Sequence, residues 1–282
     1  MSKKNIRIAL LVIGLLLAVA IQRGYISNLF RTRIDTGRRI GTVKNLNALL
    51  GNPSKATADS GNRNNYLIER PQYVVSYNDS KGGPNWVSWH LKASDIGKEQ
   101  RGEFHPDNDL PSGFKVITPS DYTHSGYDRG HMCNSKDRTD TREDDDATFL
   151  MTNMLPQTGD LNRGPWEKLE SYCRTLVFRE NDLYIIAGGY GSRETIARGA
   201  VNVPAHCWKV VVVLPKGSND FDGVNANTRV IAVDMPNVEG IKQDDWQKYI
   251  TTVKAIERAT GYDLLSALPD NVRATLETKK DG

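Results

Sequence analysis

The sequence predicts an α+β fold arranged as a single domain. Short β-rich runs recur along the chain and two longer segments have helical spacing, but strands and helices alternate irregularly, without an internal repeat or a parallel β-α-β rhythm. A length of 282 residues, with 38% hydrophobic and 25% charged residues, is ordinary globular composition. The chain is therefore long enough and apolar enough to bury a substantial core.

The first twenty residues have the pattern of a secretory signal. Three positive charges precede an unbroken apolar run of 14 residues, Ile8 to Ile21, and Ala18-Val19-Ala20 supplies a small-x-small cleavage site. The run is shorter than the roughly 20 residues of a comfortable bilayer span. We therefore expect residues 1–20 to be a signal peptide and the protein to be secreted or periplasmic, with no stable membrane partner after cleavage. The alternative is an uncleaved signal that anchors the protein in the membrane.

Charge and cysteine content narrow the class of protein. Three of the 37 Lys and Arg residues lie in the leader, which leaves 34 against 34 Asp and Glu, so a polyanionic partner would need a local basic cluster. Cys133, Cys173 and Cys207 are too few for a disulfide scaffold, their odd number leaves at least one thiol free, and no pair has the CxxC spacing of a zinc knuckle.

Residues 21–62 are expected to form a flexible N-terminal arm. This segment is rich in Arg, Asn, Ser, Gly and Thr, and LNALLG at 46–51 is its only candidate anchor to the rest of the chain. Order is predicted to begin near Tyr66, and residues 63–282 to form the single domain.

Six runs predict β-strands. YVVSY (73–77) and NWVSWHL (85–91) flank NDSKGGP, whose Asn, Gly and Pro are typical of a hairpin turn. The other four runs are nearly continuously apolar, which predicts strands in the centre of a sheet, covered on both faces. They are FLMTNM (149–154), LYIIAGG (183–189), WKVVVVL (208–214) and RVIAVD (229–234).

Two segments predict amphipathic helices. Apolar residues recur at spacings of three and four in PWEKLESYCRTLVFR, where Pro165 suits the first turn. The same spacing runs through DDWQKYITTVKAIERATGYD, where Gly261 is a plausible C-terminal stop. The acidic run REDDDA, residues 142–147, is most simply a solvated loop.

The stretch GYDRGHMCNSKDRT, residues 126–139, places Asp128, Arg129, Gly130 and His131 side by side. A lone histidine is more often structural than catalytic. Gly130 removes bulk beside the ring, which lets a large substrate approach the backbone. Arg129 supplies a planar donor suited to phosphate oxygens. Asp128 either orients a neighbour or fixes the turn.

A second candidate cluster follows in TNMLPQTGDLNRGPWEKLE, residues 152–170. On a helix, Asn162 and Glu170 would lie about 80° apart around the axis and about 12 Å apart along it. They could not bind one ion directly, but they could hold opposite sides of its hydration shell, which suits Mg²⁺ because it keeps most of its waters. Structural alternatives remain: Asn162 caps the helix, Glu170 faces solvent, and Arg163 pairs with Glu167.

Together the two clusters resemble the DNA/RNA non-specific endonucleases of the ββα-metal class, most of all the secreted sugar-nonspecific nucleases of the NucA type. The likeness runs from about Leu49 to the C-terminus. The matching blocks are LLGNP, NYL, QYVVSYN, SGYDRGH, TFLMTNMLPQT, YCR, WKVVVVL, ANTRVIAV and TGYD. The resemblance implies a ββα-metal nuclease fold, with a central, mainly antiparallel sheet flanked by helices. It also implies hydrolysis of DNA and RNA, single- and double-stranded, and for some members a protein inhibitor.

The resemblance also implies residue roles. His131 matches the general base, and Asn162 matches the single protein ligand of one hydrated Mg²⁺ or Mn²⁺ ion. Glu170 matches the carboxylate that holds the metal's waters. Arg129 matches a motif arginine near the substrate, and we include Arg163 and Asp128 as substrate-binding candidates.

The family's transition-state arginine is matched by Arg101 in GKEQRGEFHPD. The spacing to the following Phe is one residue shorter than is usual, so Gln100 occupies the expected register. Two further departures stand out. After DRGH the family usually carries small or proline residues, whereas this chain has Cys133 and Asn134. Pro165 interrupts a helix start that is usually free of proline, which puts Asn162 on a loop before the helix.

The implied reaction is one-metal hydrolysis that leaves 5′-phosphates, with little readout of bases. An ordinary imidazole pKa predicts that activity falls below a pH of about 6. Two alternatives belong to other classes. A secreted module that binds nucleic acid without cutting it, for example in DNA uptake, would lack His131, Asn162 or Glu170. A phosphatase for small substrates would gather several carboxylates or histidines around two metals.

Overall fold

The computed structural model describes residues 45–218 and 223–281, and these described residues form one compact unit. The predicted signal, residues 1–20, and the first part of the predicted arm, residues 21–44, lie outside the described residues. None of the helices in the described part of the chain is both long and apolar enough to cross a membrane.

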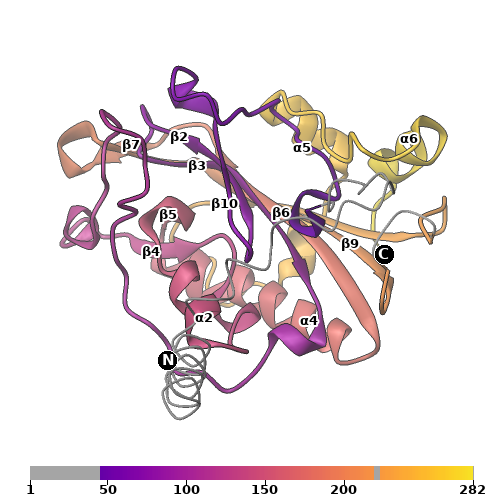
Figure 1. Ribbon diagram of the computed structural model, residues 1–282. Coiled ribbons are helices and arrows are strands. Elements are labelled where there is room, and N and C mark those ends of the chain that lie inside the picture. The colour runs from indigo at the N-terminus through magenta and orange to yellow at the C-terminus, as the bar shows by residue number, and fades with distance from the viewer. Residues whose placement is uncertain (1–44, 219–222, 282) are drawn as a thin grey trace, which may run out of the picture. The chain divides into compact units, whose positions relative to one another are not determined.

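A six-stranded sheet forms the centre of this unit (Figure 1). Its strand order is β1-β2-β3-β6-β9-β10, and all neighbouring strands pair antiparallel. The bounds are β1 Tyr66–Glu69, β2 Val74–Asn78, β3 Gly83–Leu91, β6 Asn181–Tyr190, β9 His206–Pro215 and β10 Arg229–Pro236. The predictions of an α+β fold, of an antiparallel central sheet and of the hairpin at 73–91 are therefore confirmed.

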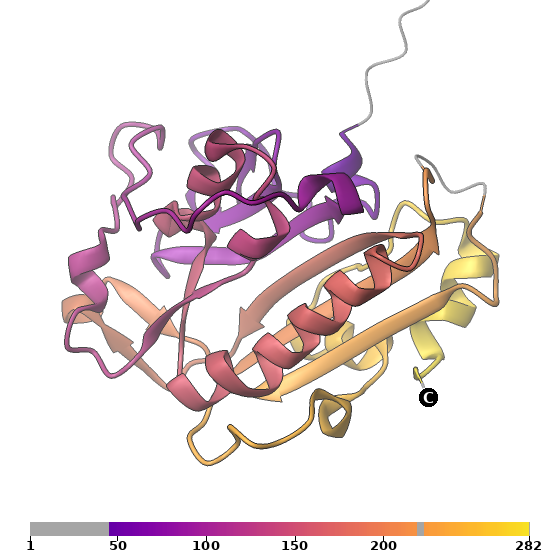
Figure 2. The ribbon, with the colours of Figure 1, turned by 90° about the horizontal axis from the view of Figure 1, so that it is seen from below.

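Each face of the sheet has its own hydrophobic cluster. The helix α4, Glu167–Val177, lies across one face and buries Leu169, Cys173 and Leu176 against β6, β9 and β10 (Figure 2). The helices α5, Val253–Thr260, and α6, Asp270–Thr278, cover the opposite face. Because successive residues of a strand face opposite sides, burial of both faces explains the continuous apolar runs in β6 and β9.

Shorter elements surround the sheet. Two ribbons of two strands each pair β4, Asp128–His131, with β5, Met154–Gln157, and β7, Glu194–Ile196, with β8, Val201–Val203. Two more helices are α2, Arg142–Thr148, and α3, Gly159–Leu161. Single 3-10 turns occur at Leu46–Ala48, Arg63–Asn65, Ala93–Asp95, Pro119–Tyr122, Ser135–Asp137, Met151–Asn153, Ala197–Gly199 and Trp246–Tyr249.

Two of the six strand predictions need correction. In FLMTNM, only Met154 belongs to a strand, and Met151–Asn153 is a 3-10 turn. The buried amide of Asn153 explains the turn, because its Nδ2 donates to the carbonyl oxygens of Cys133 at 2.9 Å and Thr148 at 2.8 Å. The strand β10, from RVIAVD, is covered on both faces as predicted, but it lies at the edge of the sheet rather than in its centre.

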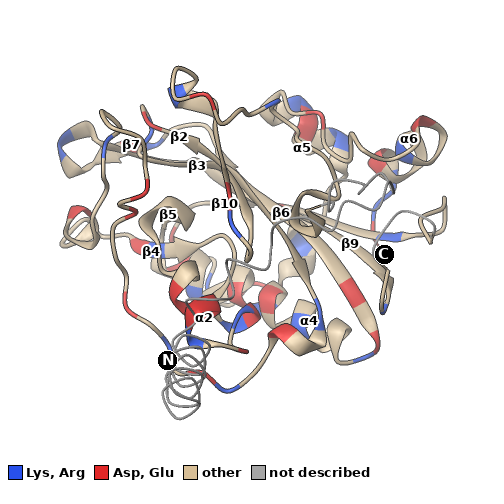
Figure 3. Ribbon diagram, viewed as in Figure 1, with Lys and Arg blue, Asp and Glu red and all other residues tan. Residues whose placement is uncertain are grey.

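The acidic run REDDDA forms the helix α2 instead of a loop. Thr141 caps its N-terminus by accepting a hydrogen bond from the backbone N–H of Asp144 at 3.1 Å. Three acidic residues then occupy the first turn, where negative charge interacts favourably with the helix dipole. Figure 3 shows α2 as a mainly acidic helix. The acidic run therefore forms a helix, and not the solvated loop that its charge predicts.

The C-terminal helical segment is interrupted. The predicted helix is divided into a 3-10 turn at Trp246–Tyr249 and α5, which begins after the extended Thr252. The hydroxyl of Thr252 caps α5 by accepting from the N–H of Ala255 at 3.1 Å, so the break is an N-cap within an apolar pattern that continues on both sides. Gly261 ends α5 in a left-handed conformation, as the sequence predicts.

Part of the predicted arm belongs to the folded unit. Leu49 and Leu50 are buried in the cluster beneath α5 and α6. The side chain of Asn47 donates to the carbonyl oxygen of Pro71 at 2.8 Å and accepts from the N–H of His90 at 3.0 Å. Packing therefore begins before the boundaries expected at residue 63 and at Tyr66. Buried LNALLG is the anchor that the sequence suggested.

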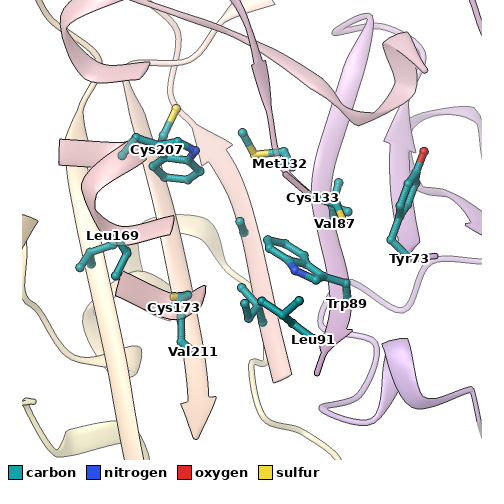
Figure 4. Close-up of a cluster of buried hydrophobic side chains, with 14 of the residues drawn as sticks. Tyr73, Val87, Trp89, Leu91, Met132, Cys133, Leu169, Cys173, Cys207 and Val211 are labelled. Atoms are coloured by element: carbon teal, nitrogen blue, oxygen red, sulfur yellow. The ribbon is translucent and has the colours of Figure 1, made fainter. Parts of the chain in front are cut away.

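All three cysteines are free and buried. Cys133 follows β4, Cys173 lies on α4 and Cys207 lies on β9, within the core cluster drawn in Figure 4. Burial raises the pKa of each thiol to about 12. The cysteines therefore stay protonated and act as small apolar core residues.

Candidate active site

The DRGH residues form the strand β4, which lies against β5 with Gly130 opposite Leu155 and His131 opposite Met154. A Cβ atom on Gly130 would lie 2.1 Å from Oε1 of Gln157, so any larger residue here would have to displace the buried glutamine side chain. The sequence predicts that the absent side chain makes room for substrate, but in the structure the side chain of Gln157 occupies that space.

His131 is buried among aromatic rings at the end of β4. Its ring lies 4.9 Å from Phe149 in an edge-to-face contact and 5.3 Å from Phe104. Burial, assisted by the positive charge of Arg101, lowers the pKa of His131 to about 3. The imidazole is therefore neutral at ordinary pH, which is the form that can accept a proton.

The two ring nitrogens of His131 have different surroundings. Nε2 is fully buried and has no hydrogen-bonding partner. His131 nevertheless lines a cavity and is 8% exposed. We infer that Nδ1 is the nitrogen that faces the cavity, because Nε2 has no exposed surface.

Asn162 is the C-cap of the short helix α3 and keeps helical angles, so it is neither the N-cap of α4 nor part of an extended loop. The N-cap is Thr158, whose hydroxyl accepts from the N–H of Leu161 at 3.2 Å. After α3 the chain makes a π turn, Asn162–Trp166, before α4 begins. Gly164 has non-helical angles there, φ −121° and ψ −119°, and a Cβ atom on it would lie 2.8 Å from the backbone of Lys242. The helical path is therefore broken at Gly164, and α4 begins after this kink at Glu167, so the later helix start predicted from Pro165 is confirmed.

The carboxylate of Asp128 orients both residues that begin this turn. It accepts a hydrogen bond from Nδ2 of Asn162 at 3.0 Å and from Nε of Arg163 at 2.8 Å, and it forms an ion pair with Arg163. With Nδ2 engaged, the Oδ1 atom of Asn162 is the one left for another partner. The alternative pairing of Arg163 with Glu167 does not occur.

Glu170 points inward from α4 and is 5% exposed, so the alternative of a solvent-facing glutamate is wrong. Its Oε1 accepts from Nζ of Lys209 at 3.2 Å, and its Oε2 accepts from Nδ2 of Asn134 at 2.5 Å. Burial raises the pKa of Glu170, and the positive charge of Lys209 opposes that shift.

A single cavity of about 210 Å³ collects six of the seven predicted site residues. Asp128 does not line the cavity, but its carboxylate accepts a hydrogen bond from the side chain of Asn162, which does. The cavity is lined by Arg101, Arg129, His131, Asn134, Ser135, Lys136, Asn162, Arg163, Glu167 and Glu170. Residues far apart in the sequence, from β4, α4 and the segment before α2, therefore converge on one site.

Two arginines border the cavity beside His131. Arg129 is fixed by hydrogen bonds from Nε at 3.2 Å and Nη2 at 2.6 Å to the carbonyl oxygen of Pro119, and its guanidinium lies over Phe104. The guanidinium of Arg101 lies 5.0 Å from the ring centroid of Phe149 and has no hydrogen-bonding or ionic partner among the described residues. Arg101 is therefore available for an anion.

The oxygen donors at this cavity fit one hydrated divalent ion. Mg²⁺ prefers oxygen ligands and retains several waters, so one amide oxygen and one nearby carboxylate are sufficient. Asn162 presents Oδ1, and Glu170 keeps acceptor capacity beyond its two hydrogen bonds because a carboxylate has about four lone-pair sites. No cysteine or second histidine lines the cavity, which argues against zinc.

One other acidic cluster lies elsewhere. Among the described residues, Glu257, Asp263 and Glu277 approach one another near α5 and α6. Lys254 and Arg273 pair with them at distances of 2.8 to 3.6 Å, so two basic residues offset most of the charge of these three acidic ones. This cluster does not line the cavity, where Glu167, Glu170 and His131 are fewer than the several carboxylates or histidines that a two-metal phosphatase gathers.

Sequence reasoning missed two residues at the site. Asn134 was noted only as a departure from the usual small residue after DRGH, yet it bonds to Glu170. Lys209 was counted within the apolar run WKVVVVL, yet it is 1% exposed and pairs with the same carboxylate. A lysine inside an otherwise buried strand was the available signal, because an ammonium group is seldom buried without a partner.

Comparisons with known proteins agree with this geometry. The family model for DNA/RNA non-specific endonucleases matches residues 50–271. A nuclease of Nostoc sp. is 50% identical over 234 residues, which cover 83% of this chain and 85% of that protein. Nuclease C1 of Cunninghamella echinulata var. echinulata is 36% identical over 180 residues, covering 58% and 70%.

The fold has a solved counterpart as well. A chain in a crystal structure of an EndoG/EndoGI complex aligns with a TM-score of 0.71 at 24% identity, covering 86% of this chain and 99% of that one. This likeness concerns the fold, whereas the family match rests on the sequence. On that match, the chain belongs to the DNA/RNA non-specific endonucleases, a family of hydrolases.

Proposed function

We propose that this protein is a secreted, metal-dependent endonuclease that hydrolyses phosphodiester bonds of single- and double-stranded DNA and RNA. Cleavage is independent of base sequence and of the sugar, and it leaves 5′-phosphates. The observation that carries the proposal is the single cavity lined by His131, Asn162 and Glu170 together with Arg101 and Arg129.

His131 is the general base. Its neutral imidazole carries its proton on the buried Nε2 and offers Nδ1 to a water in the cavity. A base whose pKa is about 3 accepts protons weakly. An anionic phosphate bound beside the ring favours the protonated form, so it opposes the effect of burial and of Arg101 on the pKa of His131.

Asn162 and Glu170 hold the divalent ion, Mg²⁺ or Mn²⁺. Asn162 would hold the ion through Oδ1, and Glu170 would accept hydrogen bonds from the ion's waters. When bound, the ion supplies positive charge that stabilises the phosphate and the departing 3′-oxygen in the transition state. Asp128 positions Asn162, because its hydrogen bond with Nδ2 keeps the amide oxygen turned away from the carboxylate.

Arg101 and Arg129 bind the phosphate that is to be cleaved. A planar guanidinium matches two phosphate oxygens, and both arginines lie over aromatic rings that restrict their movement. These contacts involve the nucleic-acid backbone, which is common to every sequence. The lack of sequence specificity follows from this mode of recognition.

The atoms balance as a hydrolysis. The water oxygen forms a bond to phosphorus as the bond between phosphorus and the 3′-oxygen breaks. The water's proton passes to Nδ1 of His131, and the departing 3′-oxygen takes a proton from solvent. The phosphate remains attached to the 5′-oxygen of the downstream nucleotide. The mechanism uses no 2′-hydroxyl, so DNA and RNA are both substrates.

The proposal extends to location and to a partner protein. The signal-like residues 1–20 support secretion or a periplasmic location, with an uncleaved membrane anchor as the alternative. The structure similar in fold comes from a complex titled as a mechanism of EndoG inhibition, which supports the proposal that a protein inhibitor also acts on this chain.

The test is cleavage of supercoiled plasmid and of RNA by purified protein in Mg²⁺ or Mn²⁺, with and without EDTA. We expect both substrates to be degraded, EDTA to stop the reaction, and His131→Ala to abolish it. A matched control is His206→Ala, since His206 lies on the α5 side of the sheet and pairs with Asp234 at 3.0 Å.

The ends of the products test the direction of cleavage. Fragments with 5′-phosphates are joined by DNA ligase and are labelled by polynucleotide kinase only after phosphatase treatment. Intact substrates in both metals would overturn the enzyme proposal. Binding without cleavage would instead support the alternative of a non-catalytic, nucleic-acid-binding module for DNA uptake.

A further inference from the structure

Lys209 is a fully buried cation directly beneath the proposed ion site. It lies in the middle of β9 with 1% of its surface exposed, and its strand neighbours Val210, Val211 and Val212 are apolar. Its Nζ atom lies 4.1 Å from the ring centroid of Trp166 and 5.6 Å from that of Trp89. Figure 4 shows Trp89 at the centre of this part of the core.

Glu170 is the anionic partner of this lysine, with 3.2 Å between Nζ and Oε1. Burying an ion pair costs several kcal/mol per ion, and well-packed apolar residues in its place are often as stable or more stable. Stability therefore gives no reason for a lysine in this strand. A residue retained at such a cost is more readily explained by what it does to Glu170.

The second carboxylate oxygen is held from another direction. Nδ2 of Asn134, in the turn after β4, donates to Oε2 of Glu170 at 2.5 Å. The amide oxygen of Asn134 also caps the next turn by accepting from the N–H of Lys136 at 2.8 Å, which fixes the side chain. Glu170 is thus held at both oxygens, by one donor inside the core and one on the cavity wall.

We propose that Lys209 and Asn134 are positioning residues that fix both carboxylate oxygens of Glu170, so that this side chain faces the hydrated ion in a single orientation. The proposal rests on the proposed function, since it assigns Glu170 to the waters of the ion. Neither residue touches the ion or the phosphate. Both act through Glu170, by removing the rotation that a lone glutamate would have to lose when the ion binds.

Asn134 supplies the outer donor to Glu170, with 2.5 Å between Nδ2 and Oε2. Alanine at this position has no donor that could reach that oxygen. Replacing Asn134 with alanine therefore tests the outer half of the arrangement. Replacing Lys209 with methionine, which has similar length and no charge, tests the inner half.

The experiment measures Mn²⁺ binding to the free protein by electron paramagnetic resonance, and kcat and KM for plasmid cleavage. We expect Lys209→Met and Asn134→Ala each to weaken Mn²⁺ binding by about 10-fold, the lower end of what loss of an outer partner of a metal site costs. We expect kcat to fall and KM for the nucleic acid to stay unchanged. Lys216→Met is the matched control, because Lys216 is an exposed lysine just beyond β9, paired with Glu180.

A double-mutant cycle separates positioning from a general structural role. In a Glu170→Gln background, Lys209→Met should cause no further loss of Mn²⁺ affinity, because the residue through which it acts is already changed. Additive losses would overturn the inference, as would unchanged Mn²⁺ affinity in both folded single variants. If Lys209→Met does not fold, Asn134→Ala decides the result in the same way.

A failure of the positioning roles can be distinguished from a failure of the proposed function. A wild-type protein that cuts neither DNA nor RNA defeats the proposed function, whatever the variants do. A wild-type protein that cuts, with variants that bind Mn²⁺ and turn over as it does, defeats only the positioning roles of Lys209 and Asn134.

Discussion

The carboxylate of Asp128 accepts a hydrogen bond from Nδ2 of Asn162 across 3.0 Å. This contact joins β4, which carries His131, to the π turn before α4. It also settles which end of the amide is left for an ion, since the nitrogen is already bonded. The acid of the DRGH stretch is therefore a positioning residue for the predicted metal ligand.

Removing this contact should weaken the ion site. For Asp128→Ala we expect Mn²⁺ affinity to fall about 10-fold to 100-fold, the usual cost of losing an outer partner of a metal ligand. Titration of the free protein followed by electron paramagnetic resonance measures the loss. Asp270→Asn, at an exposed position on α6, should bind Mn²⁺ as the wild type does. Equal affinity in Asp128→Ala would mean that Asn162 is not positioned by Asp128.

The position of Arg101 separates two candidate residues. The guanidinium of Arg101 lies over Phe149 beside His131, and Arg101 lines the cavity, whereas Gln100 does not. We expect Arg101→Ala to lower kcat about 100-fold, the loss typical of removing one charge-stabilising donor, and Gln100→Ala to leave kcat unchanged. Steady-state cleavage kinetics provide the measurement. The reverse ranking would show that sequence register, rather than this geometry, identifies the functional residue.

The buried environment of His131 changes the expected pH dependence. With the pKa lowered to about 3, the free enzyme keeps a neutral imidazole well below pH 6, so kcat/KM should stay level down to about pH 5. The fall below pH 6 expected from an ordinary imidazole then belongs to kcat, which reports the complex, where bound phosphate raises the pKa of His131. A tenfold drop in kcat/KM per unit, beginning at pH 6, would show that burial does not lower the pKa.

The same group should make folding stability depend on pH. The pKa of His131 is about 3 in the folded protein and about 6.5 when unfolded, so between these values the unfolded chain binds more protons. The free energy of unfolding should therefore fall as pH falls through this window, by about 1.4 kcal/mol per pH unit at most from this group. Urea unfolding of wild type and His131→Gln measures the difference, which should shrink toward pH 3. Parallel curves would contradict the burial.

The three thiols give a test that does not depend on catalysis. Because Cys133, Cys173 and Cys207 are buried and protonated, we expect the native protein to react with none of its thiols when treated with a disulfide reagent, and the unfolded protein to react with three. Dithiothreitol should leave cleavage activity unchanged. Fewer than three reactive thiols after unfolding without reductant would reveal a disulfide.

Apolar periodicity predicted the strands that are buried on both faces and the helix that buries one face. The strands β2, β3, β6 and β9 and the helix α4 lie where apolar spacing placed them. It was wrong where a side chain bonds to the backbone. Asn153 turns FLMTNM out of the sheet, Thr141 starts a helix in REDDDA, and Thr252 divides the C-terminal helix. These are hydrogen bonds between side chains and the backbone, which apolar spacing does not record.

The sequence motifs predicted which residues form the candidate site. Six of the seven residues chosen from the sequence line one cavity, and the seventh, Asp128, contacts one of them. The directions of their hydrogen bonds were not predictable. That Asp128 holds Asn162, that Gln157 fills the space beside Gly130 and that Lys209 lies beneath Glu170 all depend on contacts between distant segments.

The central claim is that His131 and Asn162 face one ion across the same cavity. Its most direct test is nuclear magnetic resonance of protein with isotope-labelled histidine, titrated with substoichiometric Mn²⁺, which broadens signals only from nearby nuclei. We predict that the ring signals of His131 broaden strongly in the wild type and far less in Asn162→Ala, and that those of His206 stay sharp in both. Sharp His131 signals in the wild type, or equal broadening in Asn162→Ala, would contradict the claim.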